Sequence, residues 1–256
     1  MFTVVIPARY SSTRFPGKPL AFIGNKTMIE HVYQRAAASK ATKVIVATDD
    51  QRIVDVVKGF GGEFCMTAST HVSGTDRIYE VVAKYQLTDE EIVVNVQGDE
   101  PLIPPAVINQ VADNLRLNTV AAAATLSEAI NNANDFTNEN IVKVVTDKND
   151  CALYFSRAAI PFFRGLSAFS ELNPETPLLS QRYPQRHIGI YAYRVALLNQ
   201  FVQWPVATLE SLESLEQLRI LANAEKIHVS QSVENVPAGI DTPEDLERLE
   251  KRLSQI

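Results

Sequence analysis

The stretch TVVIPARYSSTRFPGKP, residues 3–19, joins an apolar run to a loop that carries three cations. Residues 3–8 predict a buried strand, because Val and Ile follow one another without alternating with polar residues. Arg9, Arg14 and Lys18 then fall in a loop punctuated by Pro and Gly. The loop matches neither the GxxxxGK phosphate loop nor the GxGxxG dinucleotide motif. Its cations could still hold a triphosphate if a metal shared the charge, although ordinary solvated cations are the alternative.

Outward from this stretch, strand-like apolar runs alternate with segments of helical spacing. The predicted strands cover residues 3–8, 43–50, 63–68 and 92–100. The predicted helices cover residues 28–39, 51–60 and 75–85. This alternation is typical of a mainly parallel central sheet with helices on both faces. Ligands of such sheets bind beyond the carboxyl ends of the strands, which is where the cationic loop lies.

The second half of the chain is less regular. Segments 141–150 and 151–160 indicate two strands joined by a turn, and HIGIYAYRV, residues 187–195, indicates a third. Between them, residues 162–186 show little periodicity. The Leu-rich residues from 208 onward predict one continuous helix. A strand over 226–233 and a closing helix that starts at Thr242 and Pro243 complete the chain.

The composition excludes several classes of protein. The 256-residue chain has a net charge of -6, whereas general binders of nucleic acid or anionic membranes need a basic surface. Cys65 and Cys151 are far apart and outside any CxxC spacing, which argues against a disulfide framework or a zinc site. The chain has no run of about 18 apolar residues, and its start lacks the pattern of a signal peptide. We therefore expect a cytoplasmic protein without a nucleic-acid or membrane partner.

Two carboxylates are candidates for a metal site. In VNVQGDEP, Asp99 and Glu100 follow a buried strand through Gly98, so a carboxylate is presented at the carboxyl end of that strand. Magnesium takes one or two protein oxygens together with phosphates and waters. Asp241, in GIDTPEDL, is either the second ligand or a helix cap, because Thr242 and a helix start follow it.

Several polar side chains in otherwise apolar segments are candidates for ligand recognition. They are Arg77, Gln97, Arg157, His187, Tyr191, Glu216 and Gln217. A buried arginine needs an anionic partner, because an unpaired buried charge is costly. Gln97 binds either a ligand or only its neighbours. Lone histidines are usually core residues, and we expect that of His31, His71 and His228.

Seven motifs, taken together and in order, carry a family resemblance. They are PARYSSTRFPGKP, SGTDR, VNVQGDEP, ALYFSRAAIP, RHIGIYAYR, LEQLR and GIDTPEDLE. The chain resembles the 3-deoxy-manno-octulosonate cytidylyltransferases, the CMP-Kdo synthetases, over essentially its whole length. Members of this family are usually homodimers that use CTP and Mg²⁺ to activate Kdo for lipopolysaccharide biosynthesis.

The resemblance also implies a fold and a division of the chain. The fold is the α/β, nucleotide-diphospho-sugar transferase (glycosyltransferase-A-like) type, with a mainly parallel sheet covered by helices on both faces and a small antiparallel lobe. A single domain would cover residues 1–256. Its nucleotide-binding part would cover about 1–120 and 205–256, and a smaller sugar-binding and dimerisation lobe about 120–205.

The resemblance implies roles for individual residues of this chain. The catalytic group would be Arg14, Lys18, Asp99 and Asp241, with the two aspartates as magnesium ligands. The CTP contacts would be Ala8, Arg9, Arg14, Lys18, Ser73 and Gly74. The sugar contacts would be Arg77, Gln97, Arg157, His187, Tyr191, Glu216 and Gln217.

The implied reaction is attack by the anomeric C2 hydroxyl of Kdo on the α-phosphorus of CTP, with pyrophosphate leaving in line and no general base assigned. The segment FFRGLSAF, residues 162–169, lacks the acidic residue that many relatives have there. The alternative substrates are 8-amino-3,8-dideoxy-manno-octulosonate, another acidic sugar or a sugar 1-phosphate. A non-catalytic nucleotide-binding protein is a further alternative, which the presence of Asp99, Asp241 and the three loop cations disfavours.

Overall fold

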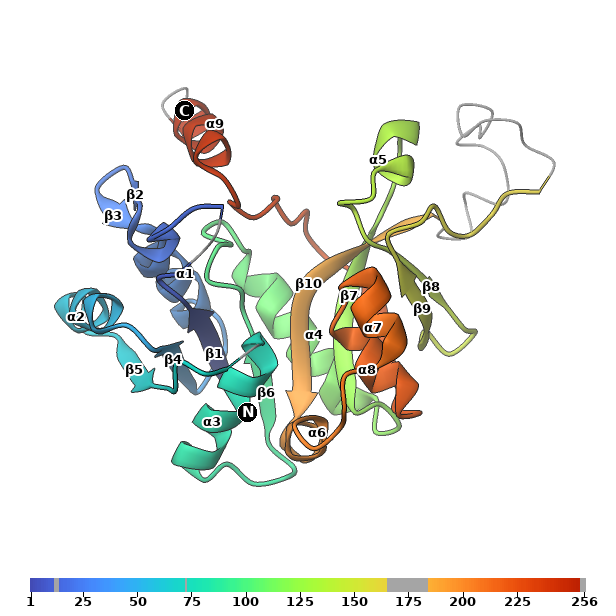
Figure 1. Cartoon of the computed structure of the whole chain (residues 1–256), viewed down its shortest axis with the longest axis horizontal. Helices are drawn as coiled ribbons and strands as arrows, with labels where there is room; N and C mark the ends of the chain where they lie inside the picture. Colours follow the sequence, from blue (N-terminus) through green and yellow to red (C-terminus); the bar gives the residue numbers. More distant parts are fainter. Residues whose placement is uncertain (12–13, 72, 165–183, 254–256) are drawn as a thin grey trace.

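The computed structural model describes residues 1–11, 14–71, 73–164 and 184–253, and its centre is a nine-stranded mixed sheet (Figure 1). The strands of this sheet are β1 (Thr3–Ala8), β4 (Lys43–Thr48), β5 (Glu63–Met66), β6 (Ile92–Asn95), β7 (Ala123–Ala129), β8 (Lys143–Thr146), β9 (Ala152–Ser156), β10 (Gln185–Arg194) and β11 (Ile227–Gln231). Their order is β11-β7-β10-β6-β1-β4-β5, and β8 pairs with β10 and β9. A separate small hairpin joins β2 (Phe22–Ile23) to β3 (Lys26–Thr27).

The helices alternate with these strands along the chain. They are α1 (Met28–Ala37), α2 (Gln51–Gly59), α3 (Gly74–Tyr85), α4 (Pro105–Leu117), α5 (Ala133–Thr137), α6 (Val195–Phe201), α7 (Thr208–Glu213), α8 (Gln217–Ala222), α9 (Pro243–Leu253) and the short 3-10 helix η1 (Lys18–Leu20). Among the described residues, no helix is both long and apolar enough to span a bilayer.

Strand β1 lies inside the sheet between two parallel partners, β4 and β6. β10 is antiparallel to β6 and to β7, and β11 is parallel to β7. The predicted α/β fold is therefore confirmed, with parallel pairing from β6 to β5, antiparallel pairing of β10 with both β6 and β7, and parallel pairing of β11 with β7. The strands of the expected smaller lobe, residues 120–205, join this same sheet, and its boundaries remain a prediction.

The side chains of β1 explain its continuous apolar sequence, because they serve two cores. Val4 and Ile6 belong to a core shared with α1, α2 and α4. Val5 belongs to a second core shared with α3, α6 and α8. Both faces of the strand are therefore buried, as expected for a parallel strand inside an α/β sheet.

Helix α9 lies at one end of the molecule beside the β2–β3 hairpin, apart from the sheet (Figure 1). Ile240, which precedes it, packs with Ile23 and Met28, and Leu246 and Leu249 of α9 join this small cluster. The packing fixes the segment that leads into α9 near the start of α1.

The sequence-based prediction of one helix from residue 208 is wrong. The segment forms two helices, α7 and α8, separated at Ser214, which has a φ of 53° in the left-handed region. The pattern of apolar residues in the sequence did not predict α4, α6 or β7. Strand β7 has the sequence AATLSEA, whose alanines have little strand preference, and its place between β10 and β11 comes from tertiary pairing.

Candidate active site

The loop after β1 is joined to the start of α3 by Arg9. Its Nη2 donates a hydrogen bond to the carbonyl of Ser73 at 2.9 Å. Burial, followed by the nearby charge of Arg77, lowers the pKa of Arg9 from its ordinary value. Ser73 and the adjoining Gly74 therefore lie beside the end of β1, and the contacts of Ala8, Ser73 and Gly74 with cytidine stay predictions.

Gly17 turns the same loop into η1. Its φ of 73° lies in the left-handed region that glycine adopts without cost. A Cβ at this position would also lie 3.3 Å from the ring of Tyr10. The turn places Lys18 at the start of η1, so that its side chain reaches the carboxylates described next.

Lys18 brings the predicted phosphate-binding and metal-binding groups together. Its Nζ lies 2.6 Å from Oδ2 of Asp99 and 3.2 Å from Oδ1 of Asp241. Nη2 of Arg14 lies 3.2 Å from the same oxygen of Asp241. The side chain of Asp241 is 46% exposed, so the cluster is open to a ligand from solvent. Residues from three distant parts of the chain thus form one group.

Asp99 and Asp241 fit a magnesium ion. Carboxylate oxygens are the ligands that this hard cation prefers, and both carboxylates already share one cation, the Lys18 ammonium. Within the described ranges, no group of three or more His, Cys, Asp or Glu could hold a metal ion. An ion on these two aspartates would therefore complete its shell with phosphate oxygens and water.

Thr242, rather than Asp241, caps α9. Oγ1 of Thr242 accepts the N–H of Asp245 at 3.3 Å, and the Asp245 carboxylate accepts the N–H of Thr242 at 2.9 Å. Such a reciprocal pair satisfies the free donors at a helix start. The Asp241 side chain is left to contact Lys18, which favours the ligand alternative over the cap.

Gly98 lets the loop after β6 approach the end of β1 closely. A Cβ on Gly98 would lie 2.8 Å from the carbonyl oxygen of Pro7, a contact that real Cβ atoms essentially never make. The N–H of Ile240 donates to the carbonyl of Asp99 at 2.9 Å, which ties Asp241 to the same place. One glycine and one backbone hydrogen bond therefore set the spacing of the two carboxylates.

Glu100 has a different environment from its neighbour Asp99. Its Oε2 is buried and has no hydrogen-bond partner among the described residues. Burial, followed by the charge of Asp99, raises the pKa of Glu100 to about 8, and Arg186 opposes this only in part. Glu100 is therefore mainly protonated near neutral pH.

Glu100→Gln is expected to change how stability depends on pH. The carboxyl of Glu100 keeps its proton up to about pH 8 in the native protein but loses it near pH 4.5 in the unfolded chain. The free energy of unfolding of the wild type therefore falls as the pH rises from about 4.5 to about 8. Glutamine resembles the protonated form, and the variant should gain roughly 4 kcal/mol over wild type at pH 8 in metal-free buffer. Urea unfolding at pH 5 and pH 8 measures this difference. An equal pH dependence in both proteins would contradict the raised pKa.

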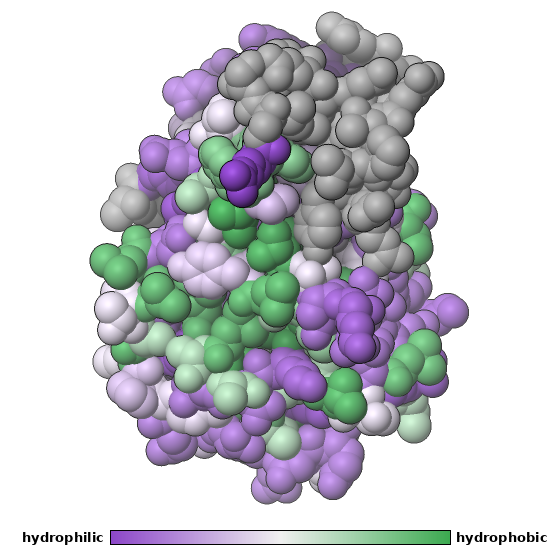
Figure 2. Space-filling model, turned by 90° about the vertical axis from the view of Figure 1, so that its right-hand side faces the viewer, coloured by the Kyte–Doolittle hydropathy of each residue, from purple (hydrophilic) through white to green (hydrophobic). Residues whose placement is uncertain are grey.

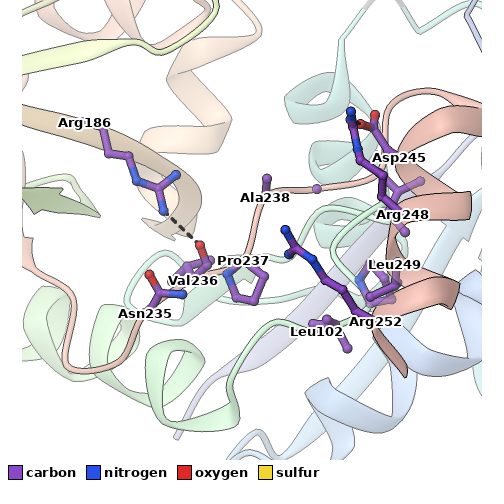
Figure 3. A pocket seen from close by; sticks show the side chains of 13 residues that line it. Leu102, Arg186, Asn235, Val236, Pro237, Ala238, Asp245, Arg248, Leu249 and Arg252 are labelled. Carbon is purple, nitrogen blue, oxygen red and sulfur yellow. Dashed lines mark hydrogen bonds and ion pairs between the residues drawn. The ribbon is translucent and has the colours of Figure 1, made fainter. Parts of the chain in front are cut away.

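A cleft of about 810 Å³ lies beside the segment that leads to Asp241. Figure 3 shows Arg186 on one side of it, donating to the carbonyl of Val236, and Arg248 and Arg252 of α9 on the other. Apolar side chains, among them Leu102, line part of it. The segment that carries Asp241 therefore borders open, positively charged space on this side.

The side chain of Arg77 has no exposed surface, and its contact with a sugar stays a prediction. Its Nη2 lies 3.0 Å from Oδ2 of Asp49, and Nη1 donates to Thr67. This is the anionic partner that a buried arginine needs. These contacts join α3 to Asp49 and Thr67, which follow β4 and β5.

Arg157 is held by backbone carbonyls. Its Nε donates to the carbonyl of Glu213 at 2.7 Å, and Nη1 donates to the carbonyl of Glu139 at 3.0 Å. The Glu213 carboxylate accepts from the N–H of Arg157, from Ser156 Oγ and from the Tyr154 hydroxyl. Burial alone would raise the pKa of Glu213, but these hydrogen bonds outweigh it and lower that pKa. The sequence analysis missed Glu213, because it lay inside the helix predicted to be continuous.

Lys143 is a second residue that the sequence analysis missed. Its side chain is fully buried, and Nζ donates to the carbonyls of Asn138, Ile141 and Arg157 at 2.9, 2.6 and 2.6 Å. Burial lowers the pKa of Lys143 from its ordinary value. The lysine thereby ties β8 to the end of β9 where Arg157 begins.

His187 and Tyr191 lie in a row of rings on β9 and β10. The His187 ring is 5.1 Å from that of Phe155 and 5.3 Å from that of Tyr191, and Tyr191 stacks on Tyr193 at 5.5 Å. Burial lowers the pKa of His187 to about 3, so it is neutral at physiological pH. Its Nε2 lies 3.2 Å from Oγ1 of Thr125.

The remaining predicted sugar contacts lie around this row. Nε2 of Gln97 makes a long, 3.5 Å contact with the carbonyl of Gly189. Glu216 accepts a hydrogen bond from Thr75, and burial raises its pKa above the ordinary value. Nε2 of Gln217 is buried and has no acceptor in the described part of the chain. Their contact with a sugar stays a prediction.

The other three histidines lie outside the cluster. Nε2 of His31 is 2.9 Å from the carbonyl of Ile23, and His71 contacts Glu80. His228 is buried in β11. His228 is thus a core residue, as expected, whereas His31 and His71 are only half-buried.

The fold and the cluster together define a nucleotide-binding α/β protein, in which a sheet presents cations and carboxylates in one place. A family model described as cytidylyltransferase matches residues 3–227. The chain is 59% identical to the 3-deoxy-manno-octulosonate cytidylyltransferase of Cellvibrio japonicus (strain Ueda107), with 98% of each chain covered. It is 58% identical to that of Saccharophagus degradans (strain 2-40), again with 98% of each covered. The chain belongs to the cytidylyltransferase family, in the group of 3-deoxy-manno-octulosonate cytidylyltransferases.

A solved structure supports the same assignment. It is a CMP:2-keto-3-deoxy-manno-octonic acid synthetase complexed with CTP, 39% identical to this chain, with a TM-score of 0.88. The match covers 100% of this chain and 99% of that one. The predicted fold type and the resemblance are thereby confirmed.

Proposed function

We propose that the chain transfers the cytidylyl group of CTP to Kdo, giving CMP-Kdo and pyrophosphate for lipopolysaccharide biosynthesis in the cytoplasm. The observation that carries this proposal is the contact of Lys18 and Arg14 with Asp99 and Asp241. This contact supports the proposal, because cations suited to a triphosphate lie beside carboxylates suited to a metal ion, in a chain closely related to enzymes of this name.

Arg14 and Lys18 act on the triphosphate. On binding CTP they exchange their carboxylate partners for phosphate oxygens, and they stabilise the charge that builds on the leaving pyrophosphate. Asp99 and Asp241 are then free to hold magnesium, which when bound neutralises phosphate charge and lowers the pKa of the attacking hydroxyl.

Arg157 holds the carboxylate of the sugar acid next to its C2 hydroxyl. Two neutral carbonyls fix its guanidinium, so its charge is available to an anion. His187 is neutral, and a pKa of about 3 makes it a poor proton acceptor, in line with a reaction that depends on positioning and electrostatics.

Pyrophosphate release from CTP tests the proposed function. Kdo, its 8-amino analogue and sialic acid are compared in parallel, each with magnesium and with EDTA. We expect release with Kdo and magnesium, and loss of release when EDTA removes the metal. Preference for the amino analogue would keep the chemistry and change the substrate. No release with any sugar would favour the non-catalytic alternative.

We also propose that the protein is a homodimer, as expected for the family. Figure 2 shows apolar side chains gathered in the middle of the face that carries β8, β9 and α7. Phe162, Leu153 and Leu212 are 86%, 62% and 76% exposed. Sedimentation velocity measures the oligomeric state. Of the segment FFRGLSAF, residues 165–169 lie outside the described part, so its role is not assigned.

A further inference from the structure

The helical segment that starts at Thr208 is interrupted at one residue. α7 ends at Glu213, Ser214 has φ 53° and ψ 48°, and α8 starts at Gln217. For a residue other than glycine this left-handed conformation costs free energy, so other contacts must compensate. The Ser214 side chain is exposed and makes no hydrogen bond with the described residues, so it does not cause the break.

A buried ion pair stabilises the break. Arg219 of α8 donates from Nε to Oε2 of Glu210 at 2.8 Å and from Nη2 to Oε1 at 2.5 Å. The Arg219 guanidinium also lies 4.3 Å from the centre of the Phe201 ring. In a continuous helix, residues nine apart would lie on opposite faces and about 13 Å apart along the axis. The pair therefore requires α8 to fold back on α7.

The break also frees the carbonyl of Glu213. In a continuous helix this carbonyl would accept from the N–H four residues later, but that bond is absent from the described chain. The carbonyl accepts instead from Nε of Arg157 at 2.7 Å. The carboxylate of Glu213 accepts from the backbone N–H of Arg157 at 2.9 Å. One residue thus holds both the backbone and the guanidinium of Arg157.

This arrangement leaves one edge of Arg157 for a ligand. Among the described residues, Nη2 has no hydrogen-bond acceptor, and the nearby Glu213 carboxylate interacts with the charge of Arg157 without forming an ion pair with the guanidinium. A planar guanidinium fixed through Nε and Nη1 keeps its charge and loses little entropy when it binds an anion.

We propose that Glu213 and Ser214 are positioning residues, and that the break between α7 and α8 holds Arg157 in place for the carboxylate of the acidic sugar. This inference rests on the proposed function and deepens it. The conformation of residue 214 should set the KM for the sugar and leave the KM for CTP unchanged.

Two substitutions of the exposed Ser214 form a matched test. Ser214→Gly and Ser214→Val both remove the hydroxyl, but glycine adopts the left-handed conformation without cost and valine does so with the greatest difficulty. We expect Ser214→Gly to keep the wild-type KM for Kdo. Ser214→Val should raise it about tenfold, with the KM for CTP changed less than about twofold.

The position of Arg157 is also measured without any substrate. A nitrogen–proton correlation spectrum reports the Arg157 Nε–H, assigned by its loss in Arg157→Lys. This proton should exchange slowly in wild type and Ser214→Gly and quickly in Ser214→Val, because its bond to the Glu213 carbonyl is lost.

The outcomes separate this inference from the proposed function. Suppose that the wild type is active but Ser214→Val changes neither the spectrum nor the KM for Kdo, or raises the KM values for Kdo and CTP alike. The positioning role of Glu213 and Ser214 is then overturned, while the proposed function stands. If wild type transfers to no acidic sugar, the proposed function fails, and with it the role toward the sugar, whatever the spectrum shows. Should Ser214→Val not fold, Glu213→Gln replaces it, and an unchanged KM for Kdo in that variant would equally overturn the inference.

Discussion

Asp99→Asn is expected to lower kcat for CMP-Kdo formation by about 10²- to 10³-fold, the range seen when one preorganised electrostatic group is lost from an active site. The substitution keeps the size of the side chain and removes the charge that lies 2.6 Å from Lys18. With one of two carboxylates gone, magnesium is held only by Asp241, and triphosphate charge is less well neutralised. Pyrophosphate release at saturating CTP and magnesium measures the loss.

Glu100→Gln is the matched control for this prediction. It makes the same change of one oxygen to nitrogen at the adjacent residue, where a pKa of about 8 already keeps the carboxyl mainly protonated near neutral pH. Its activity at pH 7 should stay within about threefold of wild type. Near-normal turnover in Asp99→Asn, with an unchanged melting temperature, would show that Asp99 holds no catalytic metal.

Lys143→Met is expected to have the largest effect on stability. It leaves the carbonyls of Asn138, Ile141 and Arg157 without their shared donor inside a fully buried site. Buried acceptors that lose a partner cost about 1–3 kcal/mol each, so the loss of three bonds should cost at least about 3 kcal/mol. For a chain of this size that corresponds to a fall of roughly 10 °C in Tm.

The control for Lys143→Met lies in the same hairpin. Lys148 is exposed between β8 and β9, and Lys148→Met should change Tm by no more than about 2 °C. Differential scanning calorimetry measures the change in Tm of both variants. Equal and small effects would mean that water or backbone movement replaces the Lys143 ammonium.

The parts of the site that could be predicted are those encoded locally. The run that forms β1, the cationic loop and Asp99 after β6 each follow from a few adjacent residues, because strand ends and turns are set by local sequence. The sequence left two roles open for Asp241, a metal ligand or the cap of α9. The reciprocal hydrogen bonds of Thr242 and Asp245 show that Thr242 is the cap.

The parts that could not be predicted depend on partners far along the chain. The ion pair of Arg77 with Asp49 could not be predicted, because it depends on the packing of α3 against β4. Lys143 sits in an apolar run that gives no sign of three converging carbonyls. The sequence around Ser214 favours a helix, and its left-handed conformation arises from a tertiary ion pair, Glu210 with Arg219.

Gly98 has a consequence for how distant sequences are compared with this one. The carbonyl of Pro7 leaves no room for a Cβ at position 98, so any other residue there would force the loop away from β1 and move the following carboxylate. An aligned aspartate is then weak evidence of shared chemistry in a remote homologue. The glycine and the aspartate should therefore be compared as a pair, because a homologue without the glycine can retain the aspartate in its sequence while the carboxylate lies elsewhere.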